Sequence, residues 1–491
     1  MRIYIDGHSF HYEMENLVRL FYPNEKIAVY DNYETKPEKP YIITRMTNAD
    51  GIISLSASVY FEDYERSKCK DINADDNESE KNAERELAVI LYDLLSEYTG
   101  KKQPWGILTG VRPIKLFRRL SEQNGSEYAK KYFEQKLLVS EAKTELSAVT
   151  EINERKILSL NHRDSFSLYV SIPFCPTRCS YCSFVSQTVE RAKKLIEPYF
   201  KLLCKEIAYT GQIADEKKLR LETVYIGGGT PTTLSAEQLS ELIDVIKTSF
   251  DLTNCREFTI EAGRPDTITE EKLTAILSRG VDRISINPQT LNDDVLRVIG
   301  RKHSAAQTID AYKMAEKIGF RHINMDLIAG LPCDTPESFI NTLNTICELS
   351  PASITVHTLA LKRSSRLTLE GRGVTTETGN YAAGMLEYCE KKLTESGYHP
   401  YYLYRQTRME GNLENVGWSK DGFDGLYNVY VMDETHTIIG CGAGAVTKLK
   451  VPDSEIITRI FNYKYPYEYI NGFDEMLKRK EQVREFYDEL S

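Results

Sequence analysis

Short β-forming runs alternate with helix-forming stretches from about residue 164 to residue 358, and this alternation limits the fold more than any other feature. It predicts a parallel sheet with helices outside it, because each helix carries the chain back to the start of the next strand. Six strands are too few for a closed eight-stranded barrel, so we expect an α/β fold with an open, curved barrel. The predicted strands are 167–172, 223–226, 257–261, 282–286, 322–328 and 353–358, and the predicted helices between them are 192–208, 235–250, 269–278, 305–318 and 336–349.

The 491 residues correspond to three domains at about 150 residues each. We expect an N-terminal α+β accessory domain at 1–162, the strand–helix core at 163–375 and a C-terminal mixed α/β domain at 376–491 on the substrate side. The N-terminal part contains MRIYID and GIISLSASVYF, whose alternation is typical of strands. In the core, we expect the functional site at the carboxyl ends of the parallel strands.

Charge and cysteine usage narrow the class of protein. The 62 Lys and Arg residues against 72 Asp and Glu give a formal net charge of −10, which argues against a broad nucleic-acid-binding surface. No apolar run approaches the ~18 residues of a membrane span, and the N-terminus has no secretory apolar region. We therefore expect a cytoplasmic protein, in which closely spaced cysteines indicate a metal or redox site.

Three of the ten cysteines are close together, in the run LYVSIPFCPTRCSYCSF. They are Cys175, Cys179 and Cys182, with the spacing C-x3-C-x2-C; the other seven are interpreted as small packing residues. Three thiolates cannot complete a tetrahedral zinc site without a fourth ligand. They can hold a [4Fe–4S] cluster and leave one iron open, which is a catalytic arrangement. On the spacing alone, zinc stays an alternative.

This loop follows the first predicted strand, and there the chain resembles the radical S-adenosylmethionine (SAM) superfamily, which is defined by a CxxxCxxC loop. The resemblance implies a partial (β/α)6 barrel and two cofactors, a [4Fe–4S] cluster and SAM. In the superfamily the open iron binds the amino and carboxylate groups of SAM. One electron from the cluster then cleaves the sulfonium, and the radical formed removes a hydrogen atom from the substrate. No catalytic residue beyond the cluster and SAM is implied.

Further motifs lie at the ends of later predicted strands. The glycines of YIGGGTPTTL allow the backbone to approach a ligand closely, and a carboxylate in FTIEAGRPD can accept hydrogen bonds from ribose hydroxyls. The resemblance implies SAM contacts at Tyr169, Tyr181, Gly228, Gly229, Thr230, Glu261, Gln289, Arg301 and Asp326.

YVSIPFC, GGGTPT and DLIAGLP resemble the oxygen-independent coproporphyrinogen III oxidases, also called dehydrogenases. The N-terminal ~160 residues and the runs GILTGVRP and GNLENVGW are similar to the longer HemZ-like branch. The implied reaction is anaerobic oxidative decarboxylation of two coproporphyrinogen III propionates to vinyls, which gives protoporphyrinogen IX in haem biosynthesis. The resemblance also implies a one-electron donor such as flavodoxin or ferredoxin.

A tetracarboxylate tetrapyrrole needs arginine or lysine side chains in its site. The predicted substrate contacts are Arg178 inside the cysteine loop, Arg363 after the sixth strand and Arg405. Lys362, Arg366 and Arg408 are further candidates.

Position 184 departs from the dehydrogenases, which continue CxxxCxxCxC, because Phe184 stands where the further cysteine would be. The CxxxCxxCxF form occurs in relatives that act as haem chaperones or methylate haem. A haem-binding chaperone and a radical haem methyltransferase or ring-opening enzyme are therefore the alternatives. The chaperones' histidine-bearing haem motif is absent from GNLENVGW, and the short chaperones lack the N-terminal domain, which disfavours the chaperone alternative.

Overall fold

The computed structural model describes residues 1–31, 37–74, 79–183, 186–360, 376–406 and 410–490. These residues form two compact units. The first comprises Met1–Glu151 with the returning segment Tyr404–Glu414, and the second comprises most of the chain from Ile152 onwards. The three predicted domains stay a prediction, and the predicted boundary at 375 lies outside the described residues.

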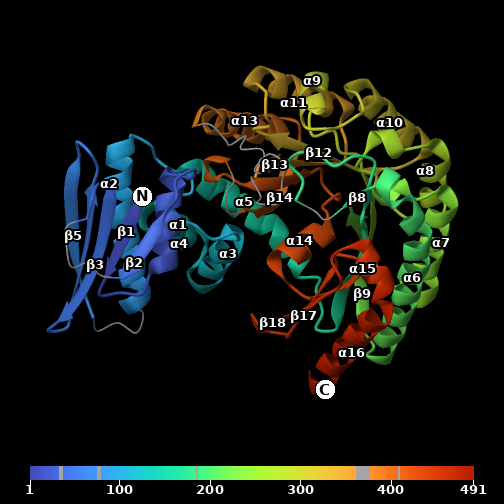
Figure 1. Cartoon of the computed structure of the whole chain (residues 1–491), viewed down its shortest axis with the longest axis horizontal. Helices are drawn as coiled ribbons and strands as arrows, with labels where there is room; N and C mark the ends of the chain where they lie inside the picture. The colour runs from blue at the N-terminus through green and yellow to red at the C-terminus, as the bar shows by residue number, and fades with distance from the viewer. Residues whose placement is uncertain (32–36, 75–78, 184–185, 361–375, 407–409, 491) are drawn as a thin grey trace. The chain divides into compact units, whose positions relative to one another are not determined.

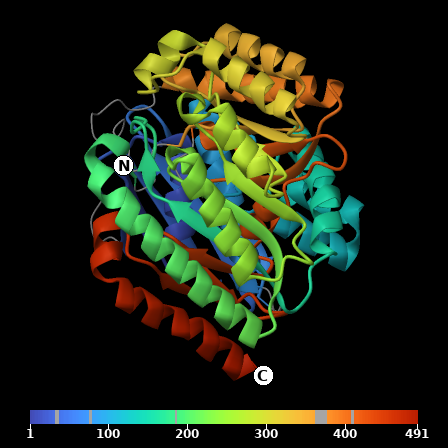
Figure 2. The same ribbon diagram turned by 90° about the vertical axis from the view of Figure 1, so that its right-hand side faces the viewer.

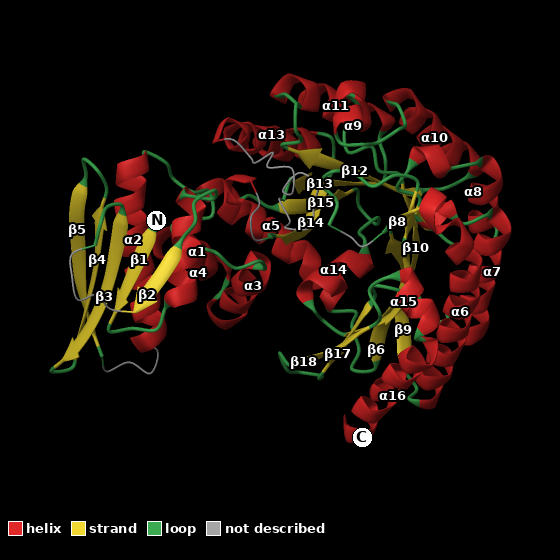
Figure 3. Cartoon of the chain, in the orientation of Figure 1, coloured by secondary structure: helices red, strands yellow, loops and turns green. Residues whose placement is uncertain are grey.

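In the described part of the second unit, an eleven-stranded sheet has the order β14-β15-β13-β12-β11-β10-β9-β6-β16-β17-β18. Six of these strands are parallel neighbours in chain order, which confirms the predicted array (Figures 1 and 3). Their side chains are buried almost without interruption, as is typical of a parallel sheet. The six are β6 (Ser165–Ile172), β9 (Arg220–Gly228), β10 (Glu257–Glu261), β11 (Arg283–Ser285), β12 (His322–Ala329) and β13 (Ser353–Thr358).

The helices that connect these strands lie side by side along the outside of the curved sheet (Figures 1 and 2). Among the described strands, β14 and β18 are separate edges, so the sheet does not close and the predicted open barrel is confirmed. All five predicted helices between the strands are present, with α9 as a short addition, and α13 follows the last of the six strands. The helices are α6 (Val189–Glu216), α7 (Ala236–Ser249), α8 (Glu270–Leu277), α9 (Asp293–Val298), α10 (Ala305–Ile318), α11 (Pro336–Leu349) and α13 (Thr376–Glu395).

The C-terminal part extends the sheet at both edges. Strand β16 pairs in parallel with β6, and β15 pairs antiparallel with β13. Helix α16 runs alongside α6 (Figures 1 and 2). The added elements are β14 (His399–Tyr404), β15 (Asn415–Ser419), α14 (Leu426–Asp433), β16 (Thr437–Cys441), β17 (Val446–Lys450), β18 (Ile457–Phe461), α15 (Pro466–Asn471) and α16 (Phe473–Leu490).

The first unit contains a five-stranded sheet in the order β2-β1-β3-β4-β5, with α1 and α2 packed on one face (Figure 3). Alternate side chains of β4, such as Leu55 and Val59, form the core with these helices. Its elements are β1 (Arg2–Asp6), α1 (His11–Phe21), β2 (Ala28–Asp31), β3 (Tyr41–Ala49), β4 (Ile52–Tyr60), β5 (Glu65–Asn73), α2 (Ser79–Thr99), α3 (Pro113–Asn124), α4 (Ser126–Lys136) and α5 (Glu141–Leu158), in which the unit boundary falls. Among the described helices, none is both long and apolar enough to cross a bilayer.

Candidate active site

The cysteine loop leaves the carboxyl end of β6 and begins with β7 (Phe174–Cys175), which pairs with β8 (Gln187–Thr188). Two hydrogen bonds tie the loop to the turn after α9: the Ser180 amide donates to the Ile299 carbonyl over 3.0 Å, and the Thr177 hydroxyl donates to the Gly300 carbonyl over 2.9 Å. Cys179 is buried, whereas Cys175 and Cys182 are partly exposed. Phe184, the residue that separates the functional alternatives, lies outside the described residues.

Polar side chains, Thr230 and Arg264 among them, donate to the cysteine sulfurs. The Thr230 hydroxyl lies 3.6 Å from Cys175 Sγ, and Arg264 Nη1 lies 3.9 Å from Cys179 Sγ. Burial raises the pKa of the Cys175 thiol, and hydrogen bonding from Ser186 and Thr230 partly offsets this effect. The donors thus favour the thiolate, which is the form that binds a metal.

The glycine run lies at the end of β9 and packs against the start of the cysteine loop. The Gly229 amide donates to the Ile172 carbonyl over 2.8 Å, and the Thr230 amide donates to the Phe174 carbonyl over 2.7 Å. A Cβ on Gly229 would lie 2.5 Å from the Phe174 oxygen, so no side chain fits there. Gly228 has a φ of +104°, which a residue with a side chain rarely adopts. The glycines therefore hold a bare backbone beside Cys175.

Glu261, the last residue of β10, lies beside a group of tyrosines. Tyr225 donates a hydrogen bond to its Oε1 over 2.5 Å, and Tyr427 stacks on Tyr225 with ring centroids 4.4 Å apart. Tyr169 stacks on both rings at 6.3 Å. Burial raises the pKa of Glu261 to about 7; Tyr225 lowers it and the charge of Asp326 raises it. The structure thus brings Tyr169, Glu261 and Asp326 into one neighbourhood.

Asp326 on β12 is held by polar residues of its own and the next strand. Asn324 Nδ2 donates to its Oδ1 over 2.7 Å, and His357 Nε2 on β13 lies 3.8 Å from its Oδ2. Burial alone raises the pKa of Asp326, but these contacts outweigh it, and the pKa is lowered. The carboxylate is therefore ionised and available as a hydrogen-bond acceptor.

Gln289 and Arg301 lie past the end of β11. Gln289 has a φ of +68° and exchanges backbone hydrogen bonds with β12, from its amide to the Asp326 carbonyl and from the Ile328 amide to its carbonyl. Arg301 donates from Nη1 to the Asn287 carbonyl over 2.6 Å and from Nη2 to the Tyr181 hydroxyl over 3.2 Å. Arg301 thereby links the turn after β11 to the cysteine loop.

Several buried polar atoms of this region have no hydrogen-bond partner among the described residues. They are Gln289 Oε1, Asn287 Oδ1, Arg301 Nε and Ser180 Oγ. Buried polar groups are nearly always paired, so this grouping at one sheet edge indicates a polar ligand. Three cysteines on one loop beside a bare glycine backbone provide the donor set that a [4Fe–4S] cluster and SAM require. The chemistry of these donors fits the two cofactors, although no three of the described His, Cys, Asp and Glu side chains are grouped closely enough to hold a metal ion.

Residues 169–346 match the family described as the Radical SAM superfamily. Over 99% of both chains, the protein is 36% identical to the oxygen-independent coproporphyrinogen-III oxidase-like protein HemZ of Bacillus subtilis. The chain belongs to the radical SAM superfamily, in its HemZ-like branch. The superfamily uses a [4Fe–4S] cluster and SAM, and these are the chain's cofactors.

Two further similarities place the chain among the relatives of HemN and HemW. It is 34% identical to the heme chaperone HemW of Bacillus subtilis, over 53% of this chain and 69% of that protein. In fold it is similar to coproporphyrinogen III oxidase (HemN) from Escherichia coli, with a TM-score of 0.52 and 24% identity over 66% of this chain and 72% of that one. The chain is a radical SAM enzyme of the HemN/HemW family.

The three predicted substrate arginines fall in different places. Arg178 is exposed within the cysteine loop, and Arg363 lies outside the described residues. Arg405 is buried in the first unit, where Nη1 donates to the Leu108 carbonyl over 2.7 Å and the guanidinium lies 5.3 Å from the Trp105 ring centre. Burial lowers the pKa of Arg405 to about 10, against the opposing charge of Glu414. The roles of all three in substrate binding stay predictions.

Sequence reasoning missed several residues of this region. Arg264 stands in the quoted run FTIEAGRPD but was not singled out, and Asn324 and Tyr225 lie on strands close to predicted contacts. Tyr427 comes from α14, far away in the sequence, and no local pattern indicates it. An arginine within a strand-end motif was the available signal for Arg264.

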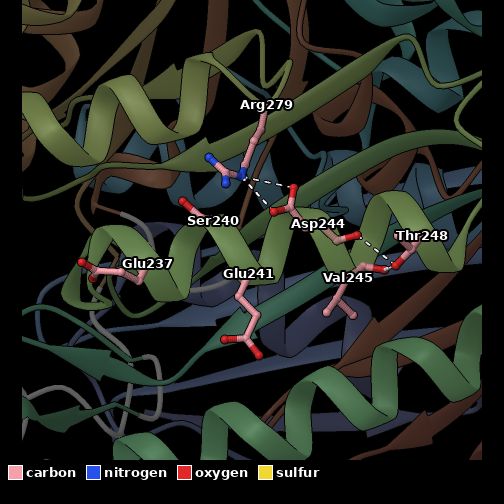
Figure 4. Close-up of a pocket in the computed structure, with 7 residues that line it drawn as sticks. All are labelled: Glu237, Ser240, Glu241, Asp244, Val245, Thr248 and Arg279. Carbon is pink, nitrogen blue, oxygen red and sulfur yellow. Dashed lines mark hydrogen bonds and ion pairs between the residues drawn. The ribbon is translucent and has the colours of Figure 1, made fainter.

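Figure 4 shows a hollow away from these residues, on the solvent-exposed side of α7. Its main polar contact is an ion pair, with Arg279 Nε 3.1 Å from both carboxylate oxygens of Asp244. The hollow contains none of the predicted site residues. The Asp244–Arg279 pair is useful as a control for a buried Arg–Asp pair of the site.

Proposed function

We propose that the chain is an oxygen-independent coproporphyrinogen III dehydrogenase, which converts two propionate side chains to vinyls and forms protoporphyrinogen IX. The observation that carries the proposal is the full-length similarity to a coproporphyrinogen-III oxidase-like relative, together with the grouping of predicted cofactor residues at one sheet edge. We further propose a cytoplasmic location, in which the ten cysteines, all described and none of them in a disulfide, stay reduced.

In this proposal Cys175, Cys179 and Cys182 hold the cluster. When bound, the cluster and SAM supply the one-electron cleavage of the sulfonium and the removal of one hydrogen atom from the substrate. The glycine backbone at Gly228–Thr230 would hold the methionine part of SAM, and Glu261 would accept hydrogen bonds from the ribose. The polar lining of the proposed SAM site is completed by Gln289, Arg301 and Asp326, together with Tyr169 and Tyr181.

The substrate side of the reaction requires an electron acceptor. After a propionate has lost one hydrogen atom, release of CO2 forms the vinyl group and leaves one electron. That electron would pass to an external one-electron acceptor, and a one-electron donor such as flavodoxin or ferredoxin would supply the electron that the bound cluster needs. Arg178, exposed beside the cysteines, is the described candidate for binding a carboxylate.

A haem-binding chaperone is the second candidate, because a relative that is 34% identical is a heme chaperone. A radical haem methyltransferase or ring-opening enzyme is the third, and Phe184 instead of a further cysteine leaves room for both. These candidates share the cofactors and differ in the tetrapyrrole that they act on or carry.

The deciding experiment uses the full chain with its cluster reconstituted without oxygen. Given SAM, dithionite and coproporphyrinogen III, the protein is expected to release methionine and tetrapyrroles with vinyl groups. Cleavage of SAM without decarboxylated product would overturn the dehydrogenase assignment and retain the radical SAM chemistry. Stoichiometric haem binding together with that result would favour the chaperone.

Two alanine variants test the cluster assignment. Cys179→Ala is expected to lose the four-iron cluster and SAM cleavage, because it removes one of three proposed ligands. Cys204→Ala, a partly buried cysteine of α6, is the matched control and is expected to retain both. A Cys179→Ala protein that keeps a four-iron cluster and cleaves SAM would refute the assignment.

A further inference from the structure

Arg264 is a buried guanidinium whose three nitrogens contact different partners. It follows β10, and its side chain is only 4% exposed. Nε lies 3.1 Å from Asp266 Oδ1, and Nη2 lies 3.1 Å from Asp266 Oδ2. Nη1 lies 3.1 Å from the Thr177 hydroxyl oxygen and 3.9 Å from Cys179 Sγ. One arginine therefore contacts both an internal carboxylate and the cysteine loop.

The planar guanidinium gives this arrangement a fixed direction. Asp266 engages one edge of the group in a bidentate pair, so the remaining nitrogen must point away from the carboxylate. That nitrogen points at Cys179. The pair carries no net charge, but its positive end faces the sulfur and its negative end is turned away.

The surroundings hold the pair in place. His303 is fully buried, and its Nδ1 lies 3.7 Å from Asp266 Oδ1, the oxygen that Arg264 Nε also contacts. The Thr177 hydroxyl, which receives a hydrogen bond from Arg264, donates in turn to the Gly300 carbonyl over 2.9 Å. Arg264 is thus anchored at both ends, and its orientation toward the sulfur is determined by the fold.

We propose that Arg264 is a positioning residue that raises the reduction potential of the cluster by directing a charged N–H group at the Cys179 ligand. The proposal rests on the cluster assignment of the proposed function. An electron added to the cluster increases its negative charge, so a fixed positive group beside a ligand stabilises the reduced form. Hydrogen bonds to the sulfurs and local charge are established determinants of cluster potential.

The consequence concerns the electron donor. A higher reduction potential allows a weaker one-electron reductant to reduce the cluster. Arg264 therefore acts before any substrate is bound, and its effect is measurable on the cluster alone.

The test is a redox titration of the reconstituted full chain without SAM, followed by electron paramagnetic resonance of the reduced cluster. Arg264→Gln is expected to shift the midpoint potential to more negative values, because it removes the charge beside Cys179. Arg264→Lys, which keeps a charge but not the fork, is expected to fall between Arg264→Gln and the natural protein.

The single variant leaves Asp266 buried without its partner, so a second variant removes the pair together. Arg264→Met/Asp266→Asn is also expected to titrate at a more negative potential, since the oriented pair is lost. Arg279→Gln is the matched control. It breaks the surface Arg–Asp pair of Figure 4, and its cluster is expected to have the same midpoint potential as that of the natural protein.

The proposal is overturned if Arg264→Gln and the double variant have the same midpoint potential as the natural protein. It is also overturned if both stay folded but hold no cluster, because Arg264 would then act only in shaping the loop. If the natural protein itself holds no four-iron cluster, or Cys179→Ala retains one, the proposed function fails instead, and the two failures are distinguishable.

Discussion

Tyr225 on β9 donates a hydrogen bond of 2.5 Å to Glu261 on the neighbouring strand β10, inside the second unit. Glu261 is the last residue of β10, and Tyr225 lies within the neighbouring parallel strand β9, which ends at Gly228. The bond stabilises the ionised carboxylate, whereas burial destabilises it by more, and the pKa of Glu261 is raised to about 7. The site therefore contains a carboxylic acid that titrates near neutral pH.

The raised pKa of Glu261 predicts a pH-dependent stability difference between the natural protein and Glu261→Gln. A carboxyl whose pKa is 4.5 when unfolded and about 7 when folded stabilises the fold below pH 4.5, and this contribution is lost as the pH rises through 7. From pH 5 to pH 8, the free energy of unfolding of the natural protein should fall relative to Glu261→Gln. At ~1.4 kcal/mol per pKa unit, this fall in unfolding free energy is at most about 3 kcal/mol. It is not larger because the Glu261 side chain keeps some exposure to solvent. Urea unfolding at several pH values measures it.

Tyr225→Phe provides the matching control for that titration. Because the tyrosine hydrogen bond lowers the pKa of Glu261, its removal should move the loss of stability to higher pH. Parallel stability curves for the natural protein and Glu261→Gln would contradict the raised pKa.

Gly229→Ala should destabilise the protein and reduce cluster and SAM binding. The new Cβ would lie 2.5 Å from the Phe174 oxygen and 2.8 Å from the Ile172 oxygen, so the backbone leading to Cys175 must move. We expect a loss of about 1–3 kcal/mol in unfolding free energy. Gly384→Ala on α13 is the control, since nothing lies within 4 Å of its Cβ, and helix propensity should leave stability unchanged or raised. Equal behaviour of the two variants would refute the packing argument.

Lys480→Met should strongly destabilise the second unit. Lys480 Nζ lies 3.1 Å from Glu206 Oε1, and the two side chains are 1% and 0% exposed. The variant leaves a buried carboxylate without its cation, which costs about 3–5 kcal/mol. Chemical denaturation measures the difference, and Lys480→Met/Glu206→Gln should recover part of it.

An exposed ion pair is the control for Lys480. Lys201 and Glu197 lie 3.0 Å apart on α6 with side chains 68% and 58% exposed. Lys201→Met should leave the unfolding curve unchanged, because water solvates the charge that remains. A comparable loss in both variants would show that burial does not determine the effect.

Glu414→Gln should destabilise the first unit. The carboxylate accepts a hydrogen bond from Trp105 Nε1 over 2.7 Å and pairs with Lys143 Nζ over 2.7 Å, with both charged side chains buried. The amide can still accept from tryptophan but cannot neutralise Lys143, so we expect a loss of about 3–5 kcal/mol. Glu145→Gln, which breaks the exposed Lys130–Glu145 pair, is the control. Urea unfolding followed by tryptophan fluorescence distinguishes the two.

Local patterns predicted the strand–helix core closely. The strands 257–261 and 353–358 and the helices 305–318 and 336–349 have the predicted bounds. Short-range signals lie at these helix ends: Ser304 forms a capping box before α10, and Thr335 caps α11 with Pro336 at its first position. Such signals act within a few residues and are therefore readable from sequence.

Long-range pairing was not predictable in the same way. The short run at 437–441 forms β16, which pairs antiparallel with nearby β17 and in parallel with β6, a strand far away in the sequence. The segment Tyr404–Glu414 joins the first unit through Arg405 and Glu414, although it lies near the C-terminal domain in sequence. Strand β6 and the first unit are both far from these segments in the chain, so no local pattern specifies the two contacts.

The amino-acid sequence by itself determined the chemistry that this protein can carry: three cysteines at C-x3-C-x2-C spacing, a glycine run and polar residues at strand ends. The order and spacing of these residues along the chain indicate that chemistry without any knowledge of the fold. Only the tertiary structure decided which groups are buried and where they point, including Tyr225 on Glu261 and Arg264 toward Cys179. The reason is physical, because the pKa of a carboxyl and the direction of a guanidinium depend on solvent exclusion and on neighbours from distant segments.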